Sequence, residues 1–475
     1  MKQERLSVDV AVVGAGPAGL SAAGAAARSG ATVAIVDDNP RAGGQIWRQA
    51  VDATPAPAAA ERLAVLRRPN VTHLAATRIV AETQPGTLLL EDDERGFLLE
   101  FRTLIVCSGA RGLLLPFPGW TLPGVTGAGG LQALLKYGLG VRGQRIVIAG
   151  SGPLLLASAA TARHAGARVS HVLEQAAWRD VAGFGAGLWR WPSKLAQAAQ
   201  PATAVHRPDA YVVEAFGDQR LGRVRIRQGE REYEVDCDRL ACGFGPVPNT
   251  VLPSHLGCRI EHGAVVVDAH QRTSRDGCFA AGEGTGVGGS ELAMVEGEIA
   301  GHAATGQTAR LAALVEQRAR WQAFGDAVRE RFAIREPIRR LARPDTLLCR
   351  CEDVRYDAVA PAHGWTAAKL QTRCGMGACQ GRVCGAAAHA LFGWTPPAPR
   401  TPLVPARVGT LMLDDTDTAS CDGVWAVAAK QHAGRRSCRV AHPSVCLFRL
   451  AATECRASAL PTNNIYNDII FQLKS

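Results

Sequence analysis

Five cysteines lie close together in the C-terminal third of the chain. Cys349 and Cys351 are separated by one residue, Cys379 follows 28 residues after Cys351, and Cys374 and Cys384 flank Cys379. Thiolates are the usual ligands of iron–sulfur clusters, and a 2Fe–2S cluster takes four of them. A four-thiolate zinc site and buried free thiols are the alternatives. The Cys-x-Cys pair disfavours zinc, because zinc-binding cysteines are more often two residues apart.

A second group of residues near the N-terminus could bind phosphate. An apolar strand at 8–13 leads into a turn made of Gly14, Gly16, Pro17, Ala18 and Gly19. The first glycine permits a tight turn, the second lets the backbone approach a pyrophosphate, and the third lets the next helix pack on the strand. The N-terminus of that helix offers free N–H groups to phosphates. Asp37, 23 residues after Gly14, is placed to accept a ribose hydroxyl. The pattern predicts a dinucleotide site.

Three later segments are expected to close around the same ligand. Their small or acidic residues are Gly43, Gly44 and Gln45, then Gly109, then Gly282 and Glu283. Glu283 precedes a helix predicted at 290–304, where a carboxylate suits a sugar-alcohol chain beside a pyrophosphate. No Cys-x-x-Cys motif occurs in the chain. This argues against a dithiol–disulfide reductase, which needs two neighbouring thiols beside its flavin.

The opening pattern occurs a second time, with one difference. Gly150 and Gly152 follow a predicted strand at 145–149, and the next strand ends at Glu174, but Leu155 stands where the third glycine belongs. A carboxylate at Glu174 would favour NAD over NADP, because it repels a 2′-phosphate. A working nicotinamide site and a purely structural domain of the same fold both stay open.

The elements that position these residues must come from a large α/β protein. The 475 residues suffice for about three domains, and 47% of them are apolar. The net charge is +10, but aromatic residues make up only 5%, and no basic-aromatic motif predicts nucleic-acid binding. Neither a signal peptide nor an apolar run of membrane-spanning length is visible, so we expect a cytosolic protein. In the cytosol, 14 cysteines favour metal or redox chemistry over structural disulfides.

The repeated pattern predicts two nested dinucleotide-binding domains, the second inserted into the first. The expected segments are a first part of the FAD-binding domain at 1–115, an inserted NAD(P)-binding-like domain at 116–245, a second part of the FAD-binding domain at 246–310, a helical connector at 311–345, a small helical iron–sulfur domain at 346–395, a proline-rich return segment at 396–413, and an atypical tail at 414–475. The tail lacks clear periodicity and is expected to be disordered and to carry no chemistry.

Several segments together resemble a known family over about residues 6–413. They are Val12–Gly19, Gly43–Arg48, Cys242–Asn249, Ala281–Glu283, Cys349–Glu352 and Thr372–Cys384. These segments are similar to the FAD-containing α subunits of heteromeric bacterial amino-acid dehydrogenases, among them the opine oxidase A protein, the hydrogen cyanide synthase B protein and D-hydroxyproline dehydrogenase α. The last two segments are similar to a bacterioferritin-associated-ferredoxin-like 2Fe–2S domain.

The resemblance implies an electron-transfer function. It points to FAD on the first glycine turn and to Cys349, Cys351, Cys379 and Cys384 as cluster ligands, with Cys374 as a spare neighbour. The cluster would relay single electrons to or from the flavin. The implied partners are a second FAD-containing subunit that oxidises an amino or imino acid, and a small ferredoxin-like subunit. Association with a membrane through that complex stays open.

Two other functions remain as alternatives. The chain could be a self-contained NAD(P)H:acceptor oxidoreductase that uses the second domain, or an adaptor with zinc on its cysteines and a structural flavin. No residue stands out as a general base, because the sequence brings together neither paired carboxylates nor a His–Cys arrangement. That absence suits a chain whose chemistry is electron transfer.

Overall fold

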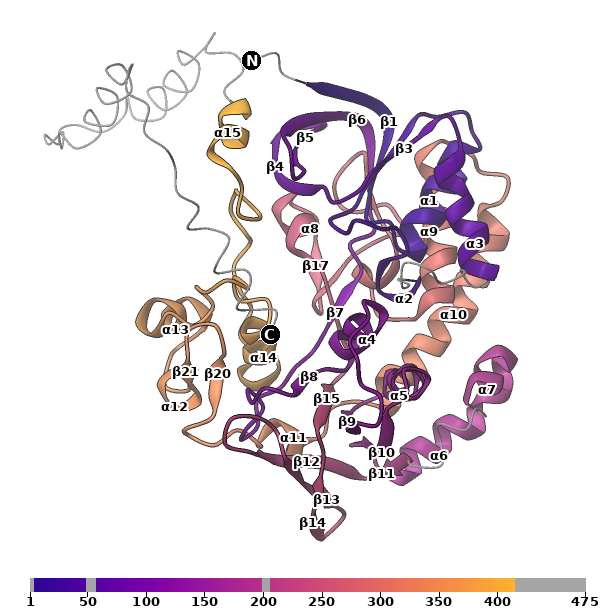
Figure 1. Ribbon diagram of the computed structural model, residues 1–475. Coiled ribbons are helices and arrows are strands. Elements are labelled where there is room, and N and C mark those ends of the chain that lie inside the picture. The colour runs from indigo at the N-terminus through magenta and orange to yellow at the C-terminus, as the bar shows by residue number, and fades with distance from the viewer. Residues whose placement is uncertain (1–3, 48–56, 199–205, 415–475) are drawn as a thin grey trace, which may run out of the picture. The chain divides into compact units, whose positions relative to one another are not determined.

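The computed structural model describes residues 4–47, 57–198 and 206–414 (Figure 1). The tail predicted at 414–475 lies outside these ranges, apart from Asp414. Within the described residues, no helix is both long enough and apolar enough to cross a membrane.

The first sheet carries the N-terminal glycine turn. Its strand order is β3-β2-β1-β6-β5-β4, with β19 also paired to β6. The strands are β1 (Arg5–Val13), β2 (Val33–Val36), β3 (Val71–Leu74), β4 (Arg78–Gln84), β5 (Thr87–Glu91), β6 (Gly96–Val106) and β19 (Cys278–Ala280). One edge of β6 pairs parallel with β1 over residues 98–106, and the other edge pairs antiparallel with β5 over residues 96–100 and parallel with β19 over residues 104–106. One long strand therefore joins a parallel dinucleotide-binding half to an antiparallel half.

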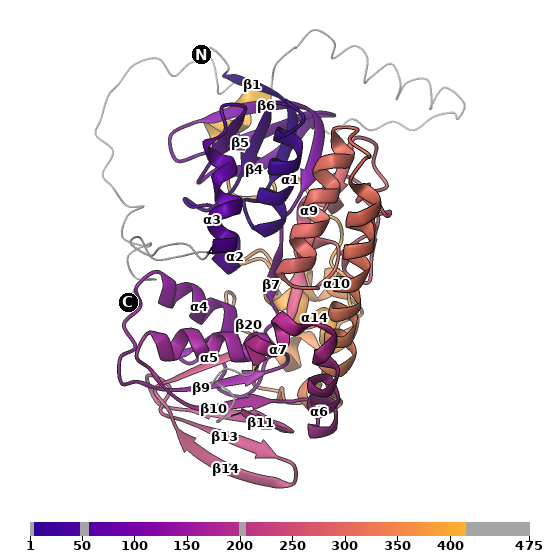
Figure 2. The ribbon, with the colours of Figure 1, turned by 90° about the vertical axis from the view of Figure 1, so that its right-hand side faces the viewer.

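Two helices pack side by side on this sheet (Figure 2). They are α1 (Pro17–Ala27), which follows the glycine turn, and α9 (Ser290–Ala304), as predicted for 290–304. A Cβ atom on Gly297 would lie 2.1 Å from the carbonyl oxygen of Ala18. The two helix backbones therefore touch, and a helix from residue 290 onward fixes the position of the N-terminal turn.

The second sheet is parallel and has the order β11-β10-β9-β15-β8. Its strands are β8 (Val125–Gly127), β9 (Arg145–Gly150), β10 (Arg168–Glu174), β11 (His206–Pro208) and β15 (Arg239–Gly243). Helices α4 (Ala128–Lys136) and α5 (Leu154–His164) pack on it. An antiparallel sheet of β12 (Ala210–Phe216), β13 (Arg223–Gln228) and β14 (Arg231–Asp236) follows, with a hairpin turn at Gly229 between β13 and β14. The mixed α/β fold with two dinucleotide-binding-like sheets is as predicted.

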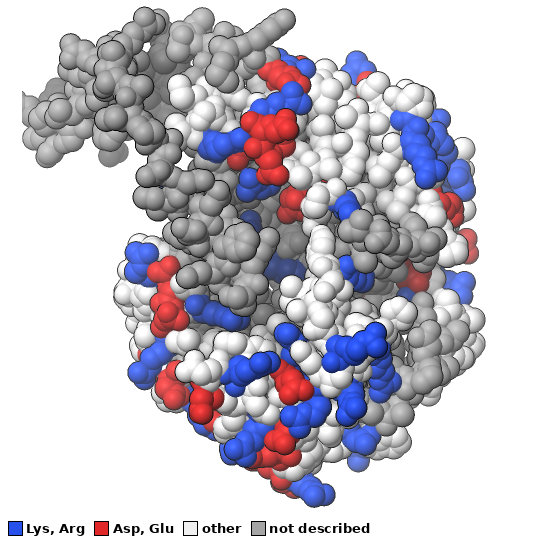
Figure 3. Space-filling view, in the orientation of Figure 1, with Lys and Arg blue, Asp and Glu red and all other residues white. Residues whose placement is uncertain are grey.

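Charged side chains of both signs alternate over β13 and β14 (Figure 3). Arg225 forms ion pairs with Glu214 and Glu234, and Arg227 pairs with Glu232. Arg225 and Arg227 are therefore paired with acidic residues of the same sheet.

The segment after β10 is helical as far as the described residues reach. It forms α6 (Trp178–Gly187), the short η2 (Leu188–Arg190) and α7 (Pro192–Ala198). Trp178 and Trp189 are exposed, whereas Trp191 is buried and donates its indole N–H to the carbonyl of Arg320. One of the three tryptophans of this segment is therefore a core residue, and the other two lie at its surface.

A long helix, α10 (Leu311–Arg331), leads to the cysteine segment. That segment contains α11 (Glu336–Arg339), β20 (Leu347–Cys349), β21 (Val354–Arg355), α12 (Tyr356–Val359), α13 (Trp365–Thr372) and α14 (Cys384–Phe392). Its apolar side chains share one core with the second sheet. Trp120, which precedes β8, donates its indole N–H to the carbonyl of Leu347 at 2.7 Å. The cysteines are therefore held by the inserted sheet as well as by their own helices.

The chain then returns to the first sheet. The Leu403 amide donates to the carbonyl of Val80 at 2.8 Å, and the Arg407 amide donates to the buried carboxylate of Glu91. The segment ends in α15 (Val408–Leu411) and η5 (Met412–Asp414). The remaining elements are α2 (Gly44–Trp47), α3 (Pro57–Leu63), η1 (Ala64–Arg67), β7 (Ala110–Gly112), β16 (Pro246–Pro248), α8 (Val251–His255), β17 (Ile260–Glu261), β18 (Ala264–Val265) and η4 (Gly282–Gly284).

Candidate functional site

The first glycine turn is shaped by two close backbone approaches. Gly14 has φ +98°, and a Cβ atom there would lie 2.3 Å from the carbonyl oxygen of Cys107. A Cβ atom on Gly19 would lie 1.7 Å from the carbonyl oxygen of Gly14, so only glycine lets α1 start this close to β1. Asp37, at the end of β2, accepts the amide of Ala15 through Oδ2 at 2.5 Å. Strand, turn, helix and acid therefore form one unit.

The structure brings the other predicted flavin-site segments to this turn. The amide of Gly43 donates to the carbonyl of Ala15 at 2.8 Å, and Gly44 lies against Gly16. Gly282 lies against Ala18, and Gly284 lies against Ser108, the neighbour of Gly109. In α2, the carbonyl of Gln45 accepts a hydrogen bond from Lys136. Segments that are 240 or more residues apart in the sequence thus meet at the N-terminus of α1.

The residues at this turn fit the pyrophosphate of FAD. Ala18 is buried and Gly16 is half-buried, α1 has no side-chain cap, and no described residue accepts a hydrogen bond from either amide. Buried N–H groups without a partner are costly, and phosphate oxygens at a helix N-terminus satisfy them. Asp37 is 6% exposed, and its Oδ1 accepts from the amide and the side chain of Asn39. Its carboxylate is thereby held in a fixed orientation beside the turn.

Glu296 is a residue of this site that the sequence patterns did not reveal. It lies in α9, is buried, and accepts the amide of Gly282 and the hydroxyl of Thr285 through Oε2, both at 2.9 Å. Arg318 from α10 donates to its other oxygen at 3.1 Å. Burial raises the pKa of Glu296, while Arg318 and the two hydrogen bonds oppose that rise. The one feature of the sequence that could have indicated Glu296 is that it is an acidic residue among small and apolar residues in α9.

Glu283 points toward the start of α9. Its Oε1 accepts the amide of Gly289, the N-cap residue of the helix, at 2.8 Å. Burial raises the pKa of Glu283, and the amides of Gly289 and Gly288 oppose that rise. The carboxylate predicted to meet a sugar-alcohol chain is thus anchored at a helix N-terminus, as its position in the sequence suggested.

The second glycine turn is built in the same way but is covered by another part of the chain. Glu174 is buried and accepts the amide of Gly152 through Oε2 at 2.7 Å, matching the contact between Asp37 and Ala15. Its Oε1 accepts the amide of Ala176. Leu155, in place of the third glycine, is buried in the core between α5 and the sheet.

Residues 332–335, which follow α10, cover the second glycine turn. Ser151 donates its hydroxyl to the carbonyl of Phe332 at 2.7 Å, and Gln175 donates to the carbonyl of Ala333 at 2.9 Å. Arg335 donates its amide to Gln175 and forms an ion pair with Asp209. The side chains beside the second turn are therefore bonded to the chain itself.

The cysteine cluster differs in one respect from the predicted ligand set. The Sγ atoms of Cys349, Cys374 and Cys384 all lie within 4.8 Å of one another, and all three residues are buried. Cys351 is exposed and its thiol contacts that of the half-buried Cys379. Of the predicted ligands, Cys349 and Cys384 thus share a buried group with Cys374, the predicted spare.

The backbone around these sulfurs suits bound thiolates. The backbone amides of Gly375 and Glu352 act to lower the pKa of the Cys349 thiol, and those of Gly381, Arg382 and Val383 act to lower the pKa of the Cys379 thiol. Burial alone would raise the pKa of Cys379, but these amides and the Cys351 thiol lower it below its usual range. Amides directed at sulfur are a recurring feature of iron–sulfur sites. The residues therefore fit a cluster.

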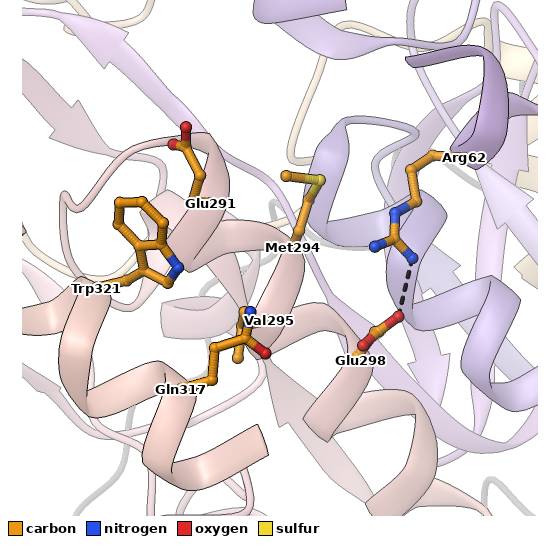
Figure 4. Close-up of a pocket in the computed structure, with 7 residues that line it drawn as sticks. All are labelled: Arg62, Glu291, Met294, Val295, Glu298, Gln317 and Trp321. Carbon is orange, nitrogen blue, oxygen red and sulfur yellow. Dashed lines mark hydrogen bonds and ion pairs between the residues drawn. The ribbon is translucent and has the colours of Figure 1, made fainter. Parts of the chain in front are cut away.

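A separate pocket of about 160 Å³ lies between α3, α9 and α10 (Figure 4). It is lined by Arg62, Glu291, Met294, Val295, Glu298, Gln317 and Trp321. Arg62 crosses it to pair with Glu298 at 2.8 Å. None of the predicted cofactor residues lines it, and it is smaller than the roughly 300–1,000 Å³ of typical ligand sites. We assign it no part in the chemistry.

Comparison with known proteins identifies the family. Residues 8–309 match the family model described as pyridine nucleotide-disulphide oxidoreductase. The chain is 33% identical to the opine oxidase A protein of Rhizobium meliloti, with 79% of this chain and 90% of that protein aligned. It is 32% identical to hydrogen cyanide synthase subunit HcnB of Pseudomonas aeruginosa, over 78% of this chain and 90% of that protein.

A solved structure with the same fold is L-proline dehydrogenase from P. horikoshii. Its TM-score is 0.63 at 18% identity, over 86% of this chain and 80% of that chain. The family resemblance predicted from the motifs is confirmed. The chain belongs to the pyridine nucleotide-disulphide oxidoreductase family and is an FAD-dependent oxidoreductase related to the opine oxidase A protein and to HcnB.

Proposed function

We propose that this chain is the electron-transfer subunit of a heteromeric dehydrogenase that oxidises an amino acid, an imino acid or an opine. FAD binds at the first glycine turn, and the cysteine segment holds a 2Fe–2S cluster. A bound flavin supplies two-electron chemistry and can also exchange single electrons with such a cluster. A second flavin-containing subunit carries the substrate site, and a small ferredoxin-like subunit completes the complex.

The observation that carries this proposal is a side chain that joins the two sites. Arg111 in β7 lies two residues after Gly109, and its Nε donates to the carbonyl of Arg382 at 3.0 Å. Arg382 lies between Cys379 and Cys384 in the sequence. The other end of the Arg111 guanidinium donates to Asn249, whose side chain donates to the carbonyl of Ser108. The flavin-side turn and the cysteine loop are therefore fixed against each other.

The chain's own residues divide the work of holding the two groups. The N-terminus of α1 and Asp37 bind and orient the dinucleotide, and Glu296 holds the 282–284 turn in place. The amides at 381–383 stabilise negative charge on Cys379. The guanidinium of Arg111, close to Cys379, places a positive charge beside the same sulfur. These are binding and positioning roles, as expected of a subunit that transfers electrons and does not activate a substrate.

The names of the relatives support a complex. The opine oxidase A protein and hydrogen cyanide synthase HcnB are both named as subunits of larger enzymes. By this analogy, the purified chain should not oxidise proline, hydroxyproline or an opine with an artificial electron acceptor. The chain purified together with its partner subunits should do so. Substrate oxidation by the isolated chain would contradict the proposed division of labour.

The competing function, a self-contained NAD(P)H oxidoreductase, gives the sharpest first test. Residues 332–335 are hydrogen-bonded to the residues beside the second turn. We therefore expect that neither NADH nor NADPH reduces the flavin. The purified chain is mixed anaerobically with NADH or NADPH, and flavin absorbance is followed. Iron and acid-labile sulfide are measured on the same sample. Fast loss of flavin absorbance would overturn the proposal and support a self-contained NAD(P)H oxidoreductase. Zinc without sulfide would overturn the cluster assignment.

A further inference from the structure

The five thiols of the cysteine segment exceed what a 2Fe–2S cluster requires. Cys351 and Cys379 contact each other, and Cys349, Cys374 and Cys384 form the buried group within 4.8 Å. A 2Fe–2S cluster takes four thiolates. One thiol in the buried group is therefore surplus, and the sequence resemblance assigns that place to Cys374.

The position of Cys374 is fixed by its surroundings. It follows α13, which ends at Arg373 in a left-handed conformation, φ +65°. Its amide donates to the hydroxyl of Thr372, and its side chain is fully buried. Arg373 is in turn held by an ion pair with Glu352 at 2.8 Å. Cys374 is thus held rigidly beside the other two thiols.

The geometry of this buried group is close to that of a shared metal. Two sulfurs on one tetrahedral metal, each about 2.3 Å from it, lie roughly 3.8 Å apart. The Sγ atoms of Cys349, Cys374 and Cys384 already lie within 4.8 Å of one another. A sulfur at Cys374 needs to move by only about 1 Å or less to take a ligand position next to Cys349.

We propose that Cys374 is a reserve ligand of the cluster, able to replace Cys384. In the exchange, the bond between iron and the Cys384 sulfur breaks, the Cys374 sulfur binds the same iron, and the proton that the Cys374 thiol releases passes to the Cys384 thiolate. The iron keeps its oxidation state, and no oxidant is required. Cys351 and Cys379 have no such substitute, because Cys374 is grouped only with Cys349 and Cys384. This inference rests on the proposed function in taking the bound group to be an iron–sulfur cluster.

Four variants of the full-length chain test the exchange: Cys374→Ala, Cys384→Ala, the Cys374→Ala/Cys384→Ala double variant, and Cys379→Ala. The readouts are iron and acid-labile sulfide per chain and the EPR spectrum after reduction with dithionite. Cys374→Ala should keep the wild-type content and spectrum. Cys384→Ala should keep more than half of the iron and sulfide with a shifted spectrum. The double variant and Cys379→Ala should each contain at least tenfold less iron and sulfide per chain than the wild type.

FAD content and far-UV circular dichroism, measured on each variant, separate loss of the cluster from loss of the fold. Three results would overturn the inference in protein that keeps its FAD. These are an empty Cys384→Ala variant, a double variant that retains as much iron as Cys384→Ala, and a Cys374→Ala variant without a cluster. Wild-type protein with zinc and no sulfide would overturn the proposed cluster instead. Zinc content of the same four variants would then decide whether Cys374 replaces Cys384 as a ligand.

Discussion

The two glycine turns of this chain share one local design and differ in what lies over them. In each, a buried acid at the end of the second strand accepts an amide of the turn: Asp37 from Ala15, and Glu174 from Gly152. At the first turn, the amides of Gly16 and Ala18 have no partner among the described residues. At the second, residues 332–335 bond to the side chains beside the turn.

The difference shows that a glycine motif predicts the local geometry of a turn but does not predict whether that turn is free to bind a ligand. The strand–turn–helix unit forms wherever the sequence allows a tight turn and a close helix. Whether its N–H groups and neighbouring side chains can meet a ligand depends on segments far away in the sequence, here the chain after α10. We therefore expect changes at the first turn to affect FAD and changes at the second to affect stability alone.

The largest effect is expected from Gly19→Ala. The new Cβ atom would lie 1.7 Å from the backbone oxygen of Gly14, which forces α1 away from β1. FAD content per chain should fall at least tenfold, as measured by absorbance after purification. Gly24→Ala is the matched control in the same helix, because its Cβ would have no neighbour closer than 3.8 Å. That variant should keep its FAD. Normal FAD in Gly19→Ala would contradict the assignment of this turn.

The corresponding position of the second turn should behave differently. Leu155 is 1% exposed and packs in the core formed by α5 and β9. Leu155→Ala should lower the free energy of unfolding by about 2–5 kcal/mol through lost burial and a cavity. Chemical denaturation followed by circular dichroism measures this. FAD content at 25 °C should stay at the wild-type level. A parallel loss of FAD would contradict the expectation that the second turn affects stability alone.

Local parts of this picture were predictable from the sequence. The first turn, the acid at Asp37 and helix α9 at 290–304 all lie where the spacing placed them, because each depends on neighbours within about 25 residues. The cover at 332–335 was not predictable, since it joins residues 181 apart, Ser151 and Phe332. Nor was the role of Arg111, which reaches Arg382 across 271 residues.

The cysteine segment shows the same limit on a smaller scale. Its spacing identified five thiols and a redox or metal site, and the structure does group buried thiols there. Spacing could not say that Cys374 would join Cys349 and Cys384, because that grouping depends on how α13 and α14 pack. Long-range packing decides such details, and a sequence pattern contains only local information.

A pH-dependent stability should arise from the acid of the second turn. Burial raises the pKa of Glu174 to about 7, although the amides of Ala176 and Gly152 and the hydroxyl of Ser151 favour its ionised form. The folded state therefore binds the proton more tightly than the unfolded state, whose value is near 4.5. The stability from this group is complete below about pH 4.5 and is lost as pH rises through 7.

Glu174→Gln should flatten this part of the pH profile. Between pH 5 and pH 8, the variant should gain stability relative to the wild type by an amount on the order of 3 kcal/mol, the equivalent of the shift. Urea denaturation at both pH values measures it. The difference between the two proteins isolates Glu174 from other titrating groups. An unchanged difference across this range would mean that Glu174 is ionised throughout.

The smallest effect separates the two acids directly. Asp37→Asn keeps the size of the side chain but removes the charge that accepts the Ala15 amide and, in our proposal, the ribose hydroxyl. Hydrogen bonds to a charged group contribute about 1.5–3 kcal/mol, so the Kd for FAD should rise roughly tenfold or somewhat more. Glu174→Gln makes the same chemical change at the second turn and should leave that Kd unchanged. Fluorescence titration of the two apoproteins with FAD gives both values. Equal losses would mean that the acids act on FAD only through general stability, and an effect of Asp37→Asn alone would place the ribose at the first turn.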